Sequence, residues 1–506
     1  MKKRNYYILL ALALIGATGC QKFLDRDLED QQRGTVIDYT ALDNMYLPVS
    51  GIYRAAGSEN PGFTHWVDLG LRTVRGDDVA KGSSPNDQGT LTDVKTFKND
   101  NPGVVSFWAL NNYWNDHFGL VLYCNDALID LDRYAANIPA GDNVNMARYN
   151  SYKGEVRFIR AWAHMLASRI FGDIPVVIDN TTLATVAKRP AADLRKWIIA
   201  EMDTCAPWME DARPNAASHV GAVTRYSALL LKAKAAADIA GNDNGSPYWD
   251  TVLNCTNQII SSNKFNLYAD YYQLFKIPGK LSNEALYELQ FTDFGTSSGT
   301  DVKPGAFFDF QGPNGNQQGS PVAGWGFLEP TQALLTFYND RDDSVRRKTT
   351  ILFAGADGNS FVTTPSGDKI YGNPNGQTRF MGKAYTPANQ MTPDRTSYGS
   401  NNNVRVLRYA DVLLLNAEAS VRKGQSGDAS FNLVRQRAKL NPISGVTLQQ
   451  VLDERKAEFS CEWWGERYND ILRTGQAVTV LGPNGFAAGK EFLPVPLTQK
   501  DLNPNL

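Results

Sequence analysis

Apolar residues recur at helical spacing through much of this chain. From residue 105 to residue 262 they return every three or four positions, and short polar breaks divide them into segments. A helix with one apolar stripe must bury that stripe against a neighbour, and a succession of such helices packs pair upon pair. The spacing therefore predicts an α-solenoid that contains helices at residues 107–132, 149–171, 193–209, 224–240 and 249–262.

The pattern changes after residue 262. Residues 263–403 are rich in Gly, Pro, Asn, Ser and Thr, and residues 285–291 alternate like a β-strand. Helical spacing returns at residues 409–423 and 428–439, and Thr447 with Gln450 predicts a capping box for one more helix. We therefore expect a mainly α fold, with a scaffold mainly at 38–262 and 404–475 and a long loop-rich insertion at 263–403 that contains short strands.

The N-terminus has the pattern of an export signal. Lys2, Lys3 and Arg4 precede an apolar run, and small residues lead to Cys20. This arrangement is typical of a bacterial lipoprotein, in which residues 1–19 are removed and Cys20 is acylated. An ordinary signal peptide with a fortuitous cysteine is the alternative. Behind Cys20 lie Asp25, Asp27, Glu29 and Asp30, which resemble the surface-export signals of Bacteroidetes lipoproteins. This resemblance implies that residues 20–506 form a single unit that is anchored by lipid to the cell outer membrane and faces the exterior.

Charge and motifs exclude several classes of function. The 53 acidic residues balance 51 basic ones, so the basic surface that nucleic-acid binding requires is not expected. The four histidines have no metal-ligand spacing and no phosphate-binding loop occurs, so we expect no metal, cofactor or catalytic site. Asp77 and Asp78 leave two alternatives open, a glycoside hydrolase and a calcium site. Besides Cys20, the chain contains four cysteines, which are expected to be buried free thiols: Cys124, Cys205, Cys255 and Cys461.

Two loops combine aromatic rings with amides and charged groups. One spans residues 305–326 and the other residues 63–87. A sugar presents an apolar C–H face and a rim of hydroxyls, which an aromatic ring and polar side chains complement. Any single ring could instead fix its loop to the body of the protein. Together the loops predict one binding site for an oligosaccharide, with ligand contacts from Trp66, Arg75, Asp78, Phe310, Asn314 and Trp325.

Several short motifs, taken in order, resemble the SusD/RagB family of Bacteroidetes surface lipoproteins. They begin with Cys20 and Phe23-Leu24-Asp25 and extend to the C-terminus. The others are Gly76-Asp77-Asp78, Phe107-Trp108, Arg157-Phe158-Ile159-Arg160-Ala161, Phe171-Gly172-Asp173-Ile174-Pro175, the run from Arg408 to Ala419, the acidic and basic residues from Glu454 to Arg473, and Phe492-Leu493-Pro494-Val495-Pro496.

The resemblance implies a fold of about four tetratricopeptide-like helix pairs, crossed by a loop-rich region. It also implies non-enzymatic capture of oligosaccharides and their delivery to a partner TonB-dependent, SusC-like transporter. Capture of peptides is the alternative within the family, and a lid that contacts no ligand is another. The suggested pairs are 38–55 with 107–132, 149–171 with 193–209, 224–240 with 249–262, and 409–423 with 428–439. Glu458, Glu462, Arg467 and Asp470 are expected to form a charge network at the terminal helix.

Overall fold

The computed structural model describes residues 37–292, 306–313, 324–391 and 401–506. Cys20, the predicted signal peptide and Asn314 lie outside these residues. The chain divides into two units: residues 37–41 belong to the N-terminal one, and residues 42–506 form the other. Every element described below belongs to the second unit.

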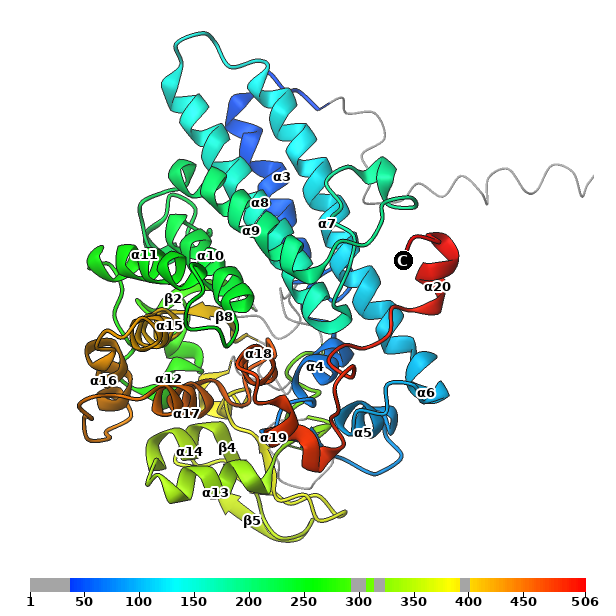
Figure 1. Cartoon of the computed structure of the whole chain (residues 1–506), viewed down its shortest axis with the longest axis vertical. Helices are drawn as coiled ribbons and strands as arrows, with labels where there is room; N and C mark the ends of the chain where they lie inside the picture. The colour runs from blue at the N-terminus through cyan, green and yellow to red at the C-terminus, as the bar shows by residue number, and fades with distance from the viewer. Residues whose placement is uncertain (1–36, 293–305, 314–323, 392–400) are drawn as a thin grey trace, which may run out of the picture. The chain divides into compact units, whose positions relative to one another are not determined.

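Four helix pairs follow one another along the chain and confirm the predicted solenoid. The first helix of each pair packs against the second, and successive pairs meet through α7 and α8, α9 and α10, and α11 and α15 (Figure 1). The fold is therefore mainly α, as the apolar spacing predicted. The pairs are α3 (Leu47–Ala56) with α7 (Trp108–Ala135), α8 (Asn143–Phe171) with α9 (Ala191–Cys205), α10 (Arg225–Ala240) with α11 (Tyr248–Ser261), and α15 (Tyr409–Arg422) with α16 (Asp428–Arg437).

Local sequence explains where these helices begin and how closely they pack. Thr224 and Ser227 form a capping box at the start of α10, and Thr447 with Gln450 forms the predicted one at the start of α17 (Leu448–Phe459). These caps satisfy backbone N–H groups that have no partner within the first turn. All six alanines of α10 are buried, and their small side chains let α9 and α11 pack close to its backbone.

The strands form four separate two-stranded antiparallel sheets. The strand predicted at 285–291 is observed at Ala285–Leu289, and all five of its residues are buried, so both of its faces are covered. Glu288 of this strand faces Arg405 of its partner, with 3.7 Å between Oε1 and Nε. The sheets pair β1 (Val79–Lys81) with β3 (Leu328–Pro330), β2 (Ala285–Leu289) with β8 (Val404–Arg408), β4 (Ile351–Phe353) with β7 (Arg379–Met381), and β5 (Phe361–Thr363) with β6 (Lys369–Tyr371).

The loop-rich region contains more regular structure than its composition indicates. Within residues 263–403 the sequence predicted strands but not α12, α13 and α14, because helices of four to nine residues are too short for a clear apolar stripe. None of the helices in the described part of the chain has the length and apolarity that a membrane crossing requires. The remaining helices are α4 (Trp66–Thr73), α5 (Thr90–Lys95), α6 (Pro102–Val105), α12 (Tyr271–Leu274), α13 (Gln332–Asp340), α14 (Ser344–Thr350), α18 (Glu466–Arg473), α19 (Ala477–Leu481) and α20 (Leu497–Leu502).

Buried ion pairs join α17 and α18 to the rest of the scaffold. Glu458 accepts hydrogen bonds from Arg408 and Arg437, and all three side chains are almost inaccessible to solvent. Asp470 accepts from Arg455 and from Arg473. Arg467 pairs with Asp77, and Glu462 pairs with Arg408 and Lys383. The predicted charge network is therefore present, and it is larger than the four residues named from the sequence.

Candidate functional site

Five aromatic rings from distant parts of the chain form one cluster, which we call the aromatic platform: Trp66, Trp108, Phe310, Trp325 and Phe327. Trp66 lies at its centre, with ring-centroid distances of 5.6 Å to Trp108, 5.2 Å to Phe310 and 5.7 Å to Trp325. Phe327 stacks on Phe310 at 4.9 Å. The structure thus brings together three of the six residues predicted from the sequence.

The platform has an exposed layer and a buried layer. Trp108 and Trp325 expose 43 % and 42 % of their surface, whereas Phe310 is fully buried. Trp66 and Phe327 are half-buried between them. The exposed indoles of Trp108 and Trp325 are therefore available to a ligand, and the more buried rings support them from the interior.

Helix starts and short backbone bonds hold the rings in place. Trp66 and Trp108 are the first residues of α4 and α7, so each projects from the end of a rigid element. The Phe327 N–H donates to the Phe310 carbonyl at 2.9 Å, and the Trp325 N–H donates to the Asp309 carbonyl at 2.6 Å. Gly326 has a φ of 68°, a left-handed conformation that a residue with a Cβ adopts only with strain. This glycine lets Trp325 turn outward while Phe327 packs inward.

The other rings of the 305–326 loop attach it to the body of the protein. Phe307 and Phe308 are buried against Trp463, with centroid distances of 5.8 and 6.1 Å. The Trp463 Nε1–H donates to the Gln311 side-chain oxygen at 2.9 Å. The alternative considered for single rings, that they fix the loop, is thus correct for Phe307 and Phe308.

Arg75 and Asp78 do not belong to the platform, and we withdraw both as ligand contacts. Arg75 is buried, donates to the Glu491 carbonyl at 2.8 Å, and lies over the ring of Tyr468. Asp78 is also buried, and its Oδ2 accepts from the Cys461 N–H at 2.8 Å. Segments from the far end of the chain cover this loop, so both side chains already have partners within the protein.

Asp77 also binds to the C-terminal helices. Arg467 and Lys456 donate to its two carboxylate oxygens at 2.6 and 2.8 Å. Burial alone would raise the pKa of Asp77, but the two cations hold it well below its ordinary range. A carboxylate that is neutralised in this way and a buried neighbour do not form the open acid pair that glycoside hydrolysis requires. Both oxygens of Asp77 are likewise occupied, which removes the support for calcium at this loop.

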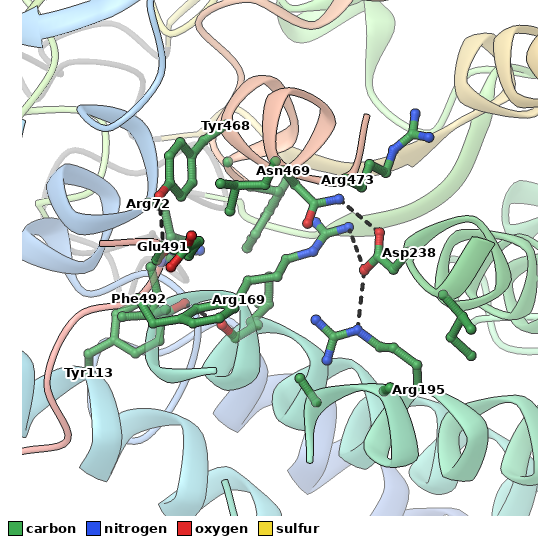
Figure 2. Close-up of a pocket in the computed structure, with 18 residues that line it drawn as sticks. Arg72, Tyr113, Arg169, Arg195, Asp238, Tyr468, Asn469, Arg473, Glu491 and Phe492 are labelled. Carbon is green, nitrogen blue, oxygen red and sulfur yellow. Dashed lines mark hydrogen bonds and ion pairs between the residues drawn. The ribbon is translucent and has the colours of Figure 1, made fainter. Parts of the chain in front are cut away.

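A cavity of about 340 Å³ lies between α8, α9, α10 and α18 (Figure 2). Figure 2 shows Asp238 at the wall of the cavity. Its carboxylate accepts hydrogen bonds from Arg195 and Asn469 and forms an ion pair with Arg169. Arg473, also on the wall, is bound to Glu418 and Asp470. The charges at the wall neutralise one another, and none of the six predicted residues lines the cavity. We therefore regard the cavity as a gap in the packing between these helices and not as the ligand site.

Sequence reasoning missed two members of the platform. Trp108 was assigned to the packing helix at 107–132, although it lies two positions from Leu110 and so about 200° around the helix from the buried stripe. That offset is a usable signal for an outward-facing ring. Phe327 lies one residue beyond the loop considered. Sequence reasoning also missed a cluster formed by His65, Asp68 and Asp116. Among the described residues, this cluster is the one that could hold a metal ion.

Comparisons with known proteins agree with this fold. The model of the SusD family matches residues 283–492. A SusD-like protein of Bacteroides ovatus is 24 % identical over 91 % of this chain and 81 % of its own length, and SusD-like protein P2 of Formosa agariphila is 25 % identical over 99 % and 98 %.

Solved structures of similar proteins share the architecture. Surface glycan-binding protein A of Bacteroides thetaiotaomicron, solved in complex with laminarihexaose, aligns with a TM-score of 0.70 at 23 % identity, covering 91 % of this chain and 97 % of its own. Its counterpart from Bacteroides fluxus has a TM-score of 0.72 at 23 % identity, with 91 % and 96 % covered. The chain is therefore similar to the SusD family, through the family model over residues 283–492 and through SusD-like relatives along most of its length.

Proposed function

We propose that this protein binds an oligosaccharide without cleaving it, and that the exposed indoles of the aromatic platform form the contact surface. One observation carries the proposal: Trp108 and Trp325 each expose more than two fifths of their surface beside Trp66, on a base of buried Phe310. Neighbouring exposed rings form the kind of apolar patch that marks a binding surface, and sugar rings stack on aromatic rings through their C–H faces.

The size of the platform predicts modest affinity. Each stacked ring supplies about 0.5–1.5 kcal/mol beyond the burial of its area. Two exposed indoles contribute about 1–3 kcal/mol in this way. With the apolar area that they bury and a few hydrogen bonds, this supports dissociation constants in the micromolar to millimolar range, at about −4 to −8 kcal/mol. A protein of similar structure was solved with laminarihexaose, and this makes laminarihexaose the first ligand to test.

The wider role follows from the proposed lipid anchor. With Cys20 acylated, the protein is held at the outer membrane, faces the exterior, and passes the bound oligosaccharide to a TonB-dependent, SusC-like transporter. Peptide capture is the second candidate. The platform favours the oligosaccharide, because its exposed side chains are flat rings rather than the apolar or acidic cleft that a peptide would require.

Two measurements on the purified protein test the proposal. Titration calorimetry measures its affinity for laminarihexaose, and a glycan and peptide array shows which other ligands it binds. Trp325→Ala and Trp108→Ala should each weaken binding about two- to twelvefold, the range that about 0.5–1.5 kcal/mol corresponds to. Phe361→Ala is the matched control, because Phe361 is 44 % exposed on the β5–β6 hairpin and its ring contacts Tyr371 rather than the platform.

Equal affinity of the two tryptophan variants and the wild type would refute the platform as the binding surface. Release of reducing ends from a bound glycan would refute the non-enzymatic role. Binding of array peptides that survives both tryptophan substitutions would favour the second candidate.

A further inference from the structure

Three possible metal ligands from two helices converge beneath the aromatic platform. His65 precedes α4, Asp68 lies in its first turn, and Asp116 lies on α7. One nitrogen or oxygen atom from each of the three residues lies within 4.8 Å of the others. His65 Nδ1 is 4.0 Å from Asp68 Oδ1, which is too far for a hydrogen bond.

The polar atoms of this cluster are buried without hydrogen bonds. Asp68 is 0 % exposed and Asp116 is 1 % exposed. Both carboxylate oxygens of Asp68, both of Asp116, and Nδ1 of His65 have no hydrogen-bond partner among the described residues. Buried polar groups are nearly always paired, so five unpaired atoms at one place call for a ligand.

The surrounding charges do not balance the two aspartates. Arg72 is the nearest cation, but its Nη2 is 3.9 Å from Asp68 Oδ2 and donates to the Phe63 carbonyl at 2.8 Å. Glu59 adds a third negative charge that acts on both aspartates. When both aspartates are ionised, three carboxylates and one guanidinium carry a net charge of −2, which one divalent cation neutralises.

His117 does not supply the missing positive charge. Its Nδ1 lies 2.7 Å from the Tyr113 carbonyl, which can only accept, so the ring donates there. Burial holds the pKa of His117 well below its ordinary value, and the ring is neutral. Burial likewise raises the pKa of Asp68 to about 8 and that of Asp116 to about 9. Protons are therefore the competing occupants of the cluster.

We infer that His65, Asp68 and Asp116 bind a divalent transition-metal ion, with zinc as the best-fitting probe. One imidazole with two carboxylates suits zinc or manganese better than calcium or magnesium, which prefer oxygen ligands alone. Ligand atoms lie about 2.0–2.2 Å from zinc and so at most about 4.4 Å apart. The observed spread of 4.8 Å closes to that value through small side-chain rotations.

The position of the ion gives it a role for the platform. The His65 ring stacks beside Trp66 at 5.8 Å and contacts Trp108 edge to face at 6.2 Å. An ion that joins His65 to Asp116 would link the start of α4 to the N-terminal third of α7. It would thereby fix two platform rings relative to each other before any ligand arrives.

Zinc titration of the full-length protein, purified without a polyhistidine tag and stripped with a chelator, tests the inference. The wild type should bind one equivalent of zinc and melt at a higher temperature with zinc than without it. Asp68→Asn and Asp116→Asn should each weaken zinc binding at least about tenfold and abolish the melting shift. Both apo variants should be about as stable as the apo wild type, because each replaces a buried carboxyl that has no hydrogen-bond partner among the described residues with an amide of the same shape.

Glu155→Gln is the matched control for a buried carboxylate. Glu155 is equally inaccessible, but it accepts hydrogen bonds from Tyr46 and Tyr53, so its substitution should leave zinc binding unchanged. His65→Gln provides a test that leaves both aspartates in place, with His219→Gln as its control.

Absence of zinc binding by the wild type would overturn the inference. Unchanged binding by Asp68→Asn, Asp116→Asn and His65→Gln would also overturn it. Neither result depends on an oligosaccharide, so this test and that of the proposed function fail separately.

Discussion

Glu458 provides the sharpest test of the buried charge network. Its side chain is fully buried and accepts hydrogen bonds from Arg408 and Arg437, with Arg346 and Lys383 close by. Replacing it with glutamine preserves the shape but leaves these cations without their shared anion. Removing one partner of a buried ion pair typically costs about 3–5 kcal/mol.

The pKa of Glu458 gives a second route to the same magnitude. Burial alone would raise it, but the four neighbouring cations lower it from 4.5 to about 2. Each pKa unit corresponds to about 1.4 kcal/mol, so this lowering contributes about 3 kcal/mol to the free energy of unfolding. Because the folded-state pKa is depressed, the contribution is fully present above pH 4.5 and is lost as the pH falls from 4.5 towards 2.

Urea unfolding followed by circular dichroism, at several values between pH 7 and pH 3, measures this contribution. Glu458→Gln should lower the free energy of unfolding by about 3 kcal/mol at pH 7, and the difference from the wild type should shrink below pH 4.5. Asp193→Asn is the control, because its half-exposed pair with Lys196 contributes at most about 1 kcal/mol. A Glu458→Gln variant within about 1 kcal/mol of the wild type at pH 7, or a difference that does not change with pH, would refute the reasoning.

Two further predictions concern buried side chains. Phe310→Ala should lower the free energy of unfolding by about 3–5 kcal/mol, since the ring is fully buried, whereas Trp325→Ala should change it by less than about 1 kcal/mol; equal losses in urea unfolding would contradict the two-layer platform. The four cysteines in the described residues are free and buried, and burial raises the pKa of Cys205 to about 12, so iodoacetamide should label none of them in the folded protein and all of them in guanidinium. Mass spectrometry of peptides checks this, and labelling of any of the four in the folded state would show that it is accessible: Cys124, Cys205, Cys255 and Cys461.

The helical scaffold was predictable because its signal is local. An apolar stripe depends only on residues three and four positions apart, and the pairs α8 with α9 and α10 with α11 were placed within a few residues of their observed bounds. The short helices α13 and α14 carry too few turns for such a signal. Their positions depend instead on what they pack against.

The candidate site was only partly predictable for a related reason. Trp66, Phe310 and Trp325 were chosen as rings in glycine-rich loops, and the structure places them in one cluster. Arg75 and Asp78 satisfied the same local criterion, yet the C-terminal part of the chain covers both. Loop composition indicates which side chains could face a ligand, but it does not indicate which of them the rest of the chain will bury.

By itself, the sequence determined the long helices of a mainly α solenoid and the presence of a loop region rich in aromatic rings. These depend on periodicity and composition, which short stretches of chain contain in full. Tertiary structure alone decided which rings form the platform, and it alone brought His65 and Asp68 to Asp116, 48 residues further on. Burial and unpaired polar atoms are properties of the surroundings of a residue, and those surroundings exist only once distant segments have packed together.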